Sequence, residues 1–311
     1  MQYSIGIDIG GTNSVMGIVD KKGVILFEAC IPTKDFPDIN DFIEAAFIKL
    51  SPEINRLGIM HFKGIGIGAP NGNYYNGSIE FAPNLIWKGI IPLAKLFNEK
   101  FKLESFVTND ANAAAIGEMM YGAAKGMNDF IMVTLGTGVG SGFVANGKMI
   151  YGHDGFAGEL GHTIAVRDGR ICGCGRKGCL ETYTSATGIV RTAHEFLENR
   201  TEESLLRHVT VLSSKDIYEA AVQQDKLALD IFDFTGKILG QSLADAVAIT
   251  SPEAIILFGG LAQAGPYIFE PTKKYLEDNL LIIYKNKIKL LPSELKESDV
   301  AILGAAALVW N

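Results

Sequence analysis

The sequence contains one short pattern twice: a strand, a glycine-rich turn and a return strand. The first copy covers Tyr3–Val19 and turns at DIGGTN, and the second covers Asp129–Ala145 and turns at LGTGVGSG. Glycine lets the backbone point its N–H groups toward an anion, and phosphate is a common ligand of such turns. Two copies about one domain length apart predict two α/β domains, each with a phosphate-binding turn.

The glycine turns differ from the widespread nucleotide-binding motifs. After Gly136 and Gly138 the third glycine is Gly140, and a strand follows, whereas the dinucleotide fingerprint opens a helix. The Walker pattern GxxxxGK[ST] is absent from the sequence. This leaves a nucleotide held by two hairpin turns. The residues of the first turn have two interpretations of about equal weight. Either the turn is a plain tight hairpin with Asp8 at its edge, or Asp8 holds Mg²⁺ through water.

Charge and composition argue against several classes of protein. The chain has 28 Lys and Arg against 35 Asp and Glu, a net charge of −7, which disfavours a broad nucleic-acid or membrane footprint. The longest strictly apolar stretch, Val300–Trp310, is too short to cross a bilayer. The first fifteen residues contain no Lys or Arg and so lack the charged start of a secretory signal. We expect a cytoplasmic protein without nucleic-acid or membrane partners.

Apolar periodicity predicts helices in both halves of the chain. One is expected over residues 38–57, with a break at Ser51-Pro52, because proline interrupts the hydrogen bonds of a helix. A second is expected over residues 180–199. A final helix over residues 300–310 has little polar character and should be packed on two sides.

Three cysteines and one histidine form the strongest cluster of chemically active residues. These are His162, Cys172, Cys174 and Cys179. Sulfur and imidazole ligands at this spacing are typical of tetrahedral zinc, and four protein ligands leave no open position, so the metal would be structural. The alternative is a set of incidental free thiols.

An Asn-Asp pair precedes the Ala-rich stretch 111–121. Either residue can cap a helix. Alternatively, Asp110 is a general base that accepts a proton from a hydroxyl attacking a γ-phosphate, and Asn109 binds the same ligand. Asn84, in the loop APN, is either a turn residue or a further ligand contact.

Two glutamates flank the Cys/His cluster. Glu159 and Glu181 are ordinary surface acids in the simplest interpretation. However, if zinc binds one ring nitrogen of His162, the other nitrogen can donate to a ligand beside Glu159. Several Asn, Asp and Glu side chains at one site would suit a sugar, because each buried hydroxyl needs a hydrogen-bond partner.

Taken together, DIGGTN, APN, ND, LGTGVGSG, GELGH and CGCGRKGCLE resemble the motifs of the ROK family of sugar kinases and repressors. They occur in the family's order over Tyr3–Thr187, and the likeness resumes weakly at Leu257–Gly260. The resemblance implies an α/β, actin-like (hexokinase-like) ATPase fold with two domains around a central cleft. The small domain is expected over 1–118, joined by the C-terminal helix 299–311. The large domain, with the zinc-binding loop, is expected over 119–298.

The resemblance also assigns roles to individual residues. It implies that the ATP phosphates and Mg²⁺ are bound by Asp8, Gly10, Gly11, Thr12 and Asn13, and by Gly136, Thr137, Gly138 and Gly140. It places the adenosine beside Gly259 and Gly260. It implies that the sugar is bound by Asn84, Asn109, Asp110, Glu159, His162 and Glu181, with Asp110 as the catalytic base. The structural Zn²⁺ would be held by His162, Cys172, Cys174 and Cys179.

The implied activity is transfer of the γ-phosphate of ATP to the 6-hydroxyl of a hexose, with glucose as the leading substrate. N-acetylmannosamine, N-acetylglucosamine and fructose are alternatives, and donors other than ATP stay open. A sugar-sensing regulator is a rival function. We expect such a regulator to have no DNA-binding domain, because the motif at Asp8 leaves no room before it for a helix-turn-helix. An actin-like scaffold is a further rival, but it has no need of the Cys/His region. Family analogy favours a dimer or tetramer.

One departure from the family pattern affects substrate preference. Many members read Pro-Gly-Pro where this chain reads Pro70-Asn71-Gly72-Asn73. Because the family's loop lies beside the sugar, the choice among hexoses is less certain than the fold or the reaction.

Overall fold

The computed structural model describes residues 1–310, without the side chain of Glu297, and divides into two compact units. Unit 1 comprises Met1–Met127, Gly142–Gly158 and the segment from Ser293 onward; unit 2 comprises Asn128–Ser141 and Glu159–Pro292. The domain limits expected from the sequence stay a prediction, and Asn311, the end of the expected helix 299–311, lies outside the described residues.

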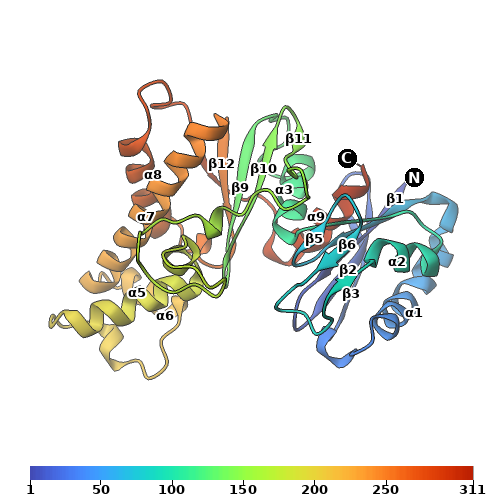
Figure 1. The fold of residues 1–311 in the computed structure, drawn as a ribbon, viewed down its shortest axis with the longest axis horizontal. Helices are drawn as coiled ribbons and strands as arrows, with labels where there is room; N and C mark the ends of the chain where they lie inside the picture. The colour runs from blue at the N-terminus through green and yellow to red at the C-terminus, as the bar shows by residue number, and fades with distance from the viewer. Residues whose placement is uncertain (311) are drawn as a thin grey trace. The chain divides into compact units, whose positions relative to one another are not determined.

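Unit 1 is built on a five-stranded sheet (Figure 1). Its strand order is β3-β2-β1-β4-β8; β1, β2 and β3 form an antiparallel meander, and β4 and β8 run parallel to β1. The elements from the N-terminus are β1 (Tyr3–Ile9), β2 (Ser14–Asp20), β3 (Ile25–Ile31), α1 (Ile39–Leu57), β4 (Phe62–Gly68), β5 (Gly72–Asn73), β6 (Ser78–Glu80), β7 (Ile90–Ile91), α2 (Leu93–Phe101), β8 (Ser105–Thr108) and α3 (Asp110–Tyr121). The short strands β5, β6 and β7 form a separate small sheet.

A second five-stranded sheet repeats this order as β11-β10-β9-β12-β13. In both sheets the first strand of the glycine hairpin lies between its return strand and a later parallel strand. The remaining elements are β9 (Phe130–Leu135), β10 (Val139–Ala145), β11 (Lys148–Met149), α4 (Glu181–Thr184), α5 (Ala186–Asn199), α6 (Ser214–Val222), α7 (Lys226–Thr250), β12 (Ala254–Phe258), α8 (Pro266–Asn279), β13 (Lys289–Pro292) and α9 (Glu297–Ala307). The pattern that occurs twice in the sequence thus corresponds to a repeated sheet topology.

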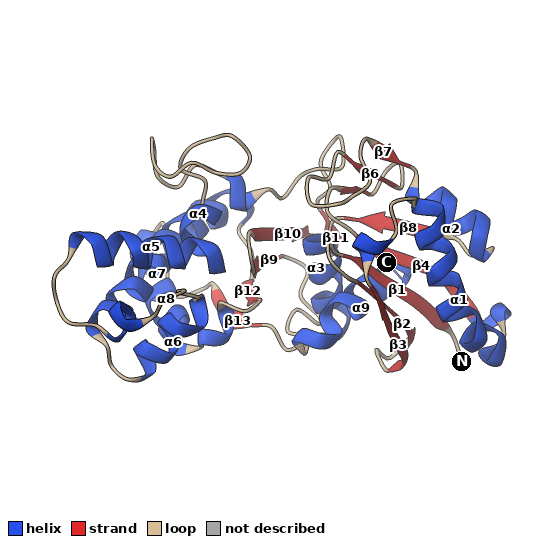
Figure 2. Cartoon of the chain, turned by 90° about the horizontal axis from the view of Figure 1, so that it is seen from below, coloured by secondary structure: helices blue, strands red, loops and turns tan. Residues whose placement is uncertain are grey.

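Helices cover both faces of the unit 1 sheet. Figure 2 shows α1 and α2 on one face and α3 and α9 on the other. The last helix packs very closely on the sheet: a Cβ at Gly66 of β4 would lie 1.8 Å from the carbonyl oxygen of Ala305 in α9. The expected apolar helix at the C-terminus is therefore present, as α9 followed by a 3₁₀ turn over Leu308–Trp310, and it is buried as its composition requires. None of the described helices is long and apolar enough to cross a membrane.

Two predicted helix boundaries were wrong. Helix α1 continues through Pro52 without a break. The carbonyl that proline leaves without a donor belongs to Ile48, whose side chain is exposed, so water can satisfy it on that face. Conversely, the single helix expected over 180–199 is divided at Ser185, which has extended backbone and caps α5 by accepting from the N–H of Gly188 at 2.9 Å.

Candidate active site

In unit 1, two aspartates meet at the edge where three parallel strands end. Asp8 of β1 pairs in register with Gly68 of β4, and Gly68 pairs with Thr108 of β8. Asp110 opens helix α3 two residues later. A Cβ at Gly68 would lie 3.2 Å from Oδ1 of Asp8 and 3.7 Å from Cα of Asp110. The structure therefore brings Asp8 and Asp110 together on either side of a glycine.

The protein around these carboxyls disfavours their charged forms. Burial raises the pKa of Asp8 to about 7, and the negative charge of Asp110 adds to the effect. Burial also raises the pKa of Asp110, against the opposing effect of the Ala111 N–H, which donates to its Oδ1 at 2.8 Å. Asp110 nevertheless has solvent-accessible surface, so a ligand can reach it. Two neighbouring carboxyl groups are a chemically suitable set of oxygen ligands for Mg²⁺.

The first glycine turn lies against the loop that carries Asn84. Gly10 donates its N–H to the carbonyl of Asn13 at 3.1 Å, which closes the turn. A Cβ at Gly11 would lie only 2.4 Å from the carbonyl oxygen of Asn84, so a larger residue would push the two segments apart. The side chains of Thr12 and Asn13 are exposed. Unit 1 thus gathers the turn, Asn84 and the aspartate pair.

The capping interpretation of Asn109 is confirmed. Its Oδ1 accepts from the N–H of Ala111 at 2.9 Å, at the start of α3. Capping occupies the side-chain carbonyl and does not use the amide N–H groups. A ligand contact through those groups stays a prediction.

In unit 2, the second glycine turn is supported by the first turn of α5. Ala186 donates its N–H to the carbonyl of Gly136 at 2.8 Å, and the Thr187 hydroxyl donates to the carbonyl of Thr137 at 2.9 Å. A Cβ at Gly138 would lie 2.8 Å from Oε2 of Glu181, the first residue of α4. The turn and the Glu181 carboxylate are therefore neighbours within unit 2.

The segment GELGH lies against the same turn. A Cβ at Gly161 would lie 2.0 Å from the carbonyl oxygen of Val139, so this contact requires glycine. Leu160 also donates its N–H to Oγ of Ser141 at 3.2 Å. These contacts hold Glu159 and His162 next to the glycine turn; Glu159 precedes a short 3₁₀ helix, and His162 is its last residue.

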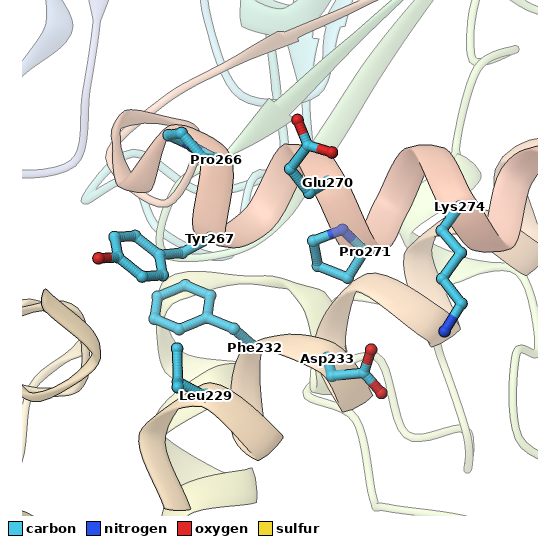
Figure 3. Close-up of a pocket in the computed structure, with 8 residues that line it drawn as sticks. All are labelled: Leu229, Phe232, Asp233, Pro266, Tyr267, Glu270, Pro271 and Lys274. Carbon is cyan, nitrogen blue, oxygen red and sulfur yellow. The ribbon is translucent and has the colours of Figure 1, made fainter. Parts of the chain in front are cut away.

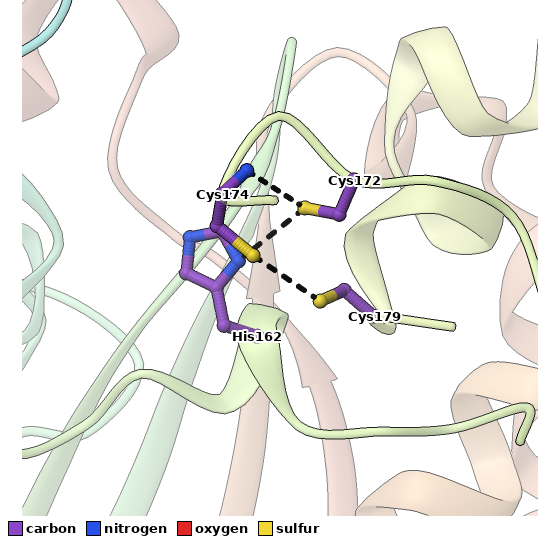
Figure 4. Close-up of side chains that lie close together, drawn as sticks. All are labelled: His162, Cys172, Cys174 and Cys179. Carbon is purple, nitrogen blue, oxygen red and sulfur yellow. Dashed lines mark hydrogen bonds between the residues drawn. The ribbon is translucent and has the colours of Figure 1, made fainter. Parts of the chain in front are cut away.

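The four expected metal ligands converge (Figure 4). Their ligand atoms all lie within 4.8 Å of one another. Sγ of Cys172 is 3.7 Å from Nδ1 of His162, and Sγ of Cys174 is 3.6 Å from Sγ of Cys179. A tetrahedral zinc with three sulfur ligands and one nitrogen ligand separates its ligand atoms by about 3.5–3.8 Å. The donor set and its spacing therefore fit zinc.

The surroundings of the three thiols also shift their pKa values. Burial raises the pKa of Cys172, whose thiol donates to Oε1 of Glu181 at 2.9 Å, and burial also raises the pKa of Cys179. The backbone N–H of Arg176 lowers the pKa of Cys174 to about 6. A dication at the centre would displace the remaining protons.

The two nitrogens of His162 face different groups. Nδ1 points toward the thiols and lies 3.7 Å from Oε1 of Glu181, whereas Nε2 lies 3.9 Å from Oε2 of Glu159. This division matches the sequence interpretation, in which one nitrogen binds metal and the other faces a ligand beside Glu159.

The glycine pair after β12 borders a hollow of about 450 Å³. Gly259 has φ +101°, a conformation that favours glycine, and its Cβ would meet the carbonyl oxygen of Leu135 at 2.7 Å. The hollow is lined by Ser214, Lys215, Tyr218, Gly260, Leu261, Gln263 and Ala264. Sequence reasoning found the glycine pair and missed the residues of α6, which are more than forty positions away and have no recognisable motif.

A second hollow, of about 370 Å³, lies between α7 and α8 (Figure 3). Phe232 and Tyr267 form its apolar side, and Asp233 and Lys274 lie toward its other end. None of the residues singled out in the sequence lines it, so it is separate from the groups described above.

Comparison with known proteins identifies the family. The family model described as ROK family matches residues 4–311. The glucokinase of Halalkalibacterium halodurans is 37% identical over 89% of this chain and 86% of its own length. The xylose repressor of Bacillus spizizenii is 32% identical over 99% of this chain and 77% of its own length.

A solved structure extends the likeness to the fold. The ROK family glucokinase from Streptomyces griseus, in complex with glucose and AMPPNP, matches with a TM-score of 0.80 and 33% identity, covering 98% of each chain. The predicted actin-like ATPase fold is thereby confirmed. The chain belongs to the ROK family.

Proposed function

We propose that this protein is an ATP-dependent hexose kinase that transfers the γ-phosphate of ATP to the 6-hydroxyl of glucose. The observation that carries the proposal is the placement of Asp110, reachable by a ligand, beside Asp8 and the first glycine turn. Relatives named glucokinase, and a similar solved structure with glucose and AMPPNP, support the same activity. The cytoplasm, where ATP and free sugars meet, is the expected location, and a homo-oligomer the expected assembly.

Asp110 would act as the general base. Its raised pKa makes the carboxylate a better proton acceptor than an ordinary aspartate, and it would take the proton of the 6-hydroxyl as that oxygen attacks phosphorus. Asn109, fixed by its capping bond, and Asn84, held against Gly11, would orient the sugar hydroxyls.

The glycine turns would bind the phosphates. In unit 1 the turn from Asp8 to Asn13 offers backbone N–H groups and the Thr12 hydroxyl, and in unit 2 the turn from Gly136 to Gly140 offers further N–H groups. Asp8 would hold Mg²⁺ through water, and the ion when bound supplies positive charge to the phosphoryl oxygens.

The GELGH segment and α4 would complete sugar recognition in unit 2. Glu159, His162 and Glu181 present two carboxylates and an imidazole beside the glycine turn. The zinc held by the Cys/His cluster would be structural, since four protein ligands close its coordination. The hollow beside Gly260 would take the nucleoside of ATP, with Tyr218, Leu261 and Lys215 among the side chains that line it.

A coupled ADP-release assay over a panel of sugars tests the proposal. We expect the highest kcat/KM with glucose among glucose, mannose, fructose, N-acetylglucosamine and N-acetylmannosamine. A preference for an N-acetylhexosamine would keep the reaction and change the substrate. Absence of turnover on every sugar, with sugar binding retained, would instead indicate a sensor related to the repressors.

Asp110→Asn should remove the base while it keeps the fold. Turnover should fall by a factor on the order of 10² or more, because the amide cannot accept the proton. Steady-state kinetics with glucose and ATP measures the effect, and Asp41→Asn, on the exposed side of α1, is the matched control. Turnover within twofold or so of wild type would exclude Asp110 as the base.

Cys172→Ser should release the zinc. The purified protein should lose the single bound metal, and its unfolding midpoint should drop on the order of 5 °C, since the metal would cross-link four side chains of the loop. Metal analysis by mass spectrometry and thermal unfolding check this. Cys30→Ser, at an exposed cysteine outside the cluster, should change neither quantity. A wild-type protein purified without metal, and not stabilised by added zinc, would contradict the assignment.

The aspartate pair should make the metal-free protein less stable as the pH rises. The folded state raises the pKa of Asp8 from 3.8 to about 7, so between these values the folded state holds a proton that the unfolded chain has lost. Stability is therefore greatest at low pH within this window and is lost on approach to neutrality. The unfolding midpoint of wild type should fall more than that of Asp8→Asn between about pH 5 and about pH 8. Equal pH profiles for the two proteins would show that Asp8 keeps an ordinary pKa; Glu198→Gln is the control at an exposed acid.

A further inference from the structure

Arg170 is a nearly buried arginine in the metal-binding loop, two residues before Cys172. Only 7% of its side chain is exposed. A guanidinium removed from water is costly unless its charge is paired and its N–H groups are bonded. It is not one of the four residues whose ligand atoms converge, so the metal does not explain its burial.

Every N–H group of this guanidinium has an acceptor. Nε and Nη2 donate to the two carboxylate oxygens of Glu195, at 2.7 and 2.6 Å. Nη1 donates to the carbonyl oxygens of Thr182 and Gly188, at 2.7 and 3.1 Å, and Nη2 also donates to Oγ1 of Thr192 at 2.9 Å. Five donors meet five acceptors in the planar arrangement that arginine provides and lysine does not.

The Thr182 carbonyl belongs to α4, and the other acceptors lie in α5, from Gly188 to Glu195. Thr182 directly follows Glu181, so the bond to its carbonyl holds the backbone next to that glutamate. Tyr183 contacts Arg170 as well. Its ring centroid lies 4.3 Å from the guanidinium carbon, and its hydroxyl accepts a hydrogen bond from the backbone N–H of Arg170 at 2.9 Å. Arg170 therefore fixes two consecutive residues of α4, Thr182 and Tyr183, to the metal-binding loop.

Glu181 itself faces the other way. Its Oε1 accepts a hydrogen bond from the Cys172 thiol at 2.9 Å, and its Oε2 would lie 2.8 Å from a Cβ at Gly138. Its carboxylate thus lies beside the metal ligands and the glycine turn, while the backbone next to it is bonded to Arg170. Zinc ligation would hold the chain at Cys179, two residues before Glu181, whereas Arg170 holds the residues directly after Glu181.

We propose that Arg170 is a positioning residue for sugar recognition: it orients Glu181 through the backbone of α4, independently of the zinc. The inference rests on the proposed kinase function, in which Glu181 binds a sugar hydroxyl. A carboxylate displaced by even a fraction of an ångström loses much of a hydrogen bond, so the affinity for sugar should depend on this arginine while the affinity for ATP does not.

Arg170→Met and Arg170→Lys test the proposal. Both should raise the KM for glucose by about tenfold, the effect expected when a group that orients a ligand-binding side chain is lost, and should leave the KM for ATP within about twofold. Bound zinc, measured by mass spectrometry, should stay at the wild-type level. Lysine should not rescue the glucose KM, because it cannot supply the five bonds. Arg191→Met is the matched control, since Arg191 is an exposed arginine of α5 with a single bond, to the carbonyl of Ile171.

Three results would overturn the proposal. An unchanged glucose KM would show that Glu181 does not need Arg170. Loss of zinc together with sugar affinity would assign Arg170 to the metal site. An equal rise in both KM values would indicate a general structural role. If Arg170→Met does not fold, Arg170→Lys and Glu195→Gln, which keeps the shape of the partner and removes its charge, give the same comparison.

Failure of the proposed function gives a different pattern. A wild-type protein that binds glucose without turnover would refute the kinase, and the dissociation constant for glucose, measured by calorimetry, would replace KM in the comparison. A wild-type protein that neither binds nor turns over any sugar would refute both.

Discussion

Like charges placed close together at the ends of parallel strands are the constraint on which unit 1 depends. The register of β1, β4 and β8 places only Gly68 between Asp8 and Asp110. Burial raises the pKa of both carboxyl groups and so disfavours their charged forms. The N-terminus of α3 compensates only part of this cost, through the Ala111 N–H. A cation and a proton-donating hydroxyl would stabilise such a pair, and in the proposed function Mg·ATP and the sugar provide them.

Unit 2 shows the same principle with different chemistry. Three thiols and an imidazole lie close together, burial raises the pKa of Cys172 and of Cys179, and Glu181 accepts a hydrogen bond from the Cys172 thiol. Here too the protein brings ligands together before a metal is present. Local contacts supply the necessary rigidity, such as Gly161 against Val139. In both units, the stability of the surrounding fold keeps together groups that would be unfavourable neighbours without a ligand. A bound cation would make their proximity favourable.

Sequence reasoning identified what is local in the chain. The glycine turns, the Cys/His ligands and the aspartates lie within short motifs, so they could be singled out from the sequence. The roles of the aspartates came from the family resemblance and not from spacing. The contact between Gly138 and Glu181, the wall that α6 gives to the hollow at Gly260, and the bonds of Arg170 all join residues distant in sequence, and no spacing encodes them. Helix boundaries failed for a related reason. Whether a proline or a serine breaks a helix depends on which face meets water or another backbone, and this is a tertiary property.

The departure from the family's Pro-Gly-Pro loop shows how one geometry can be held in two ways. At Gly72 of this loop, a Cβ would lie 2.3 Å from the carbonyl oxygen of Thr108, just before Asn109. The rigidity that prolines would give comes here from amide hydrogen bonds. Asn71, at φ +52°, donates to the carbonyl of Glu80, and Asn73 donates to the carboxylate of Glu80 and to the carbonyl of Asp154. Because asparagine tolerates positive φ and both amides are bonded, the loop keeps its place against the strand that leads to Asp110.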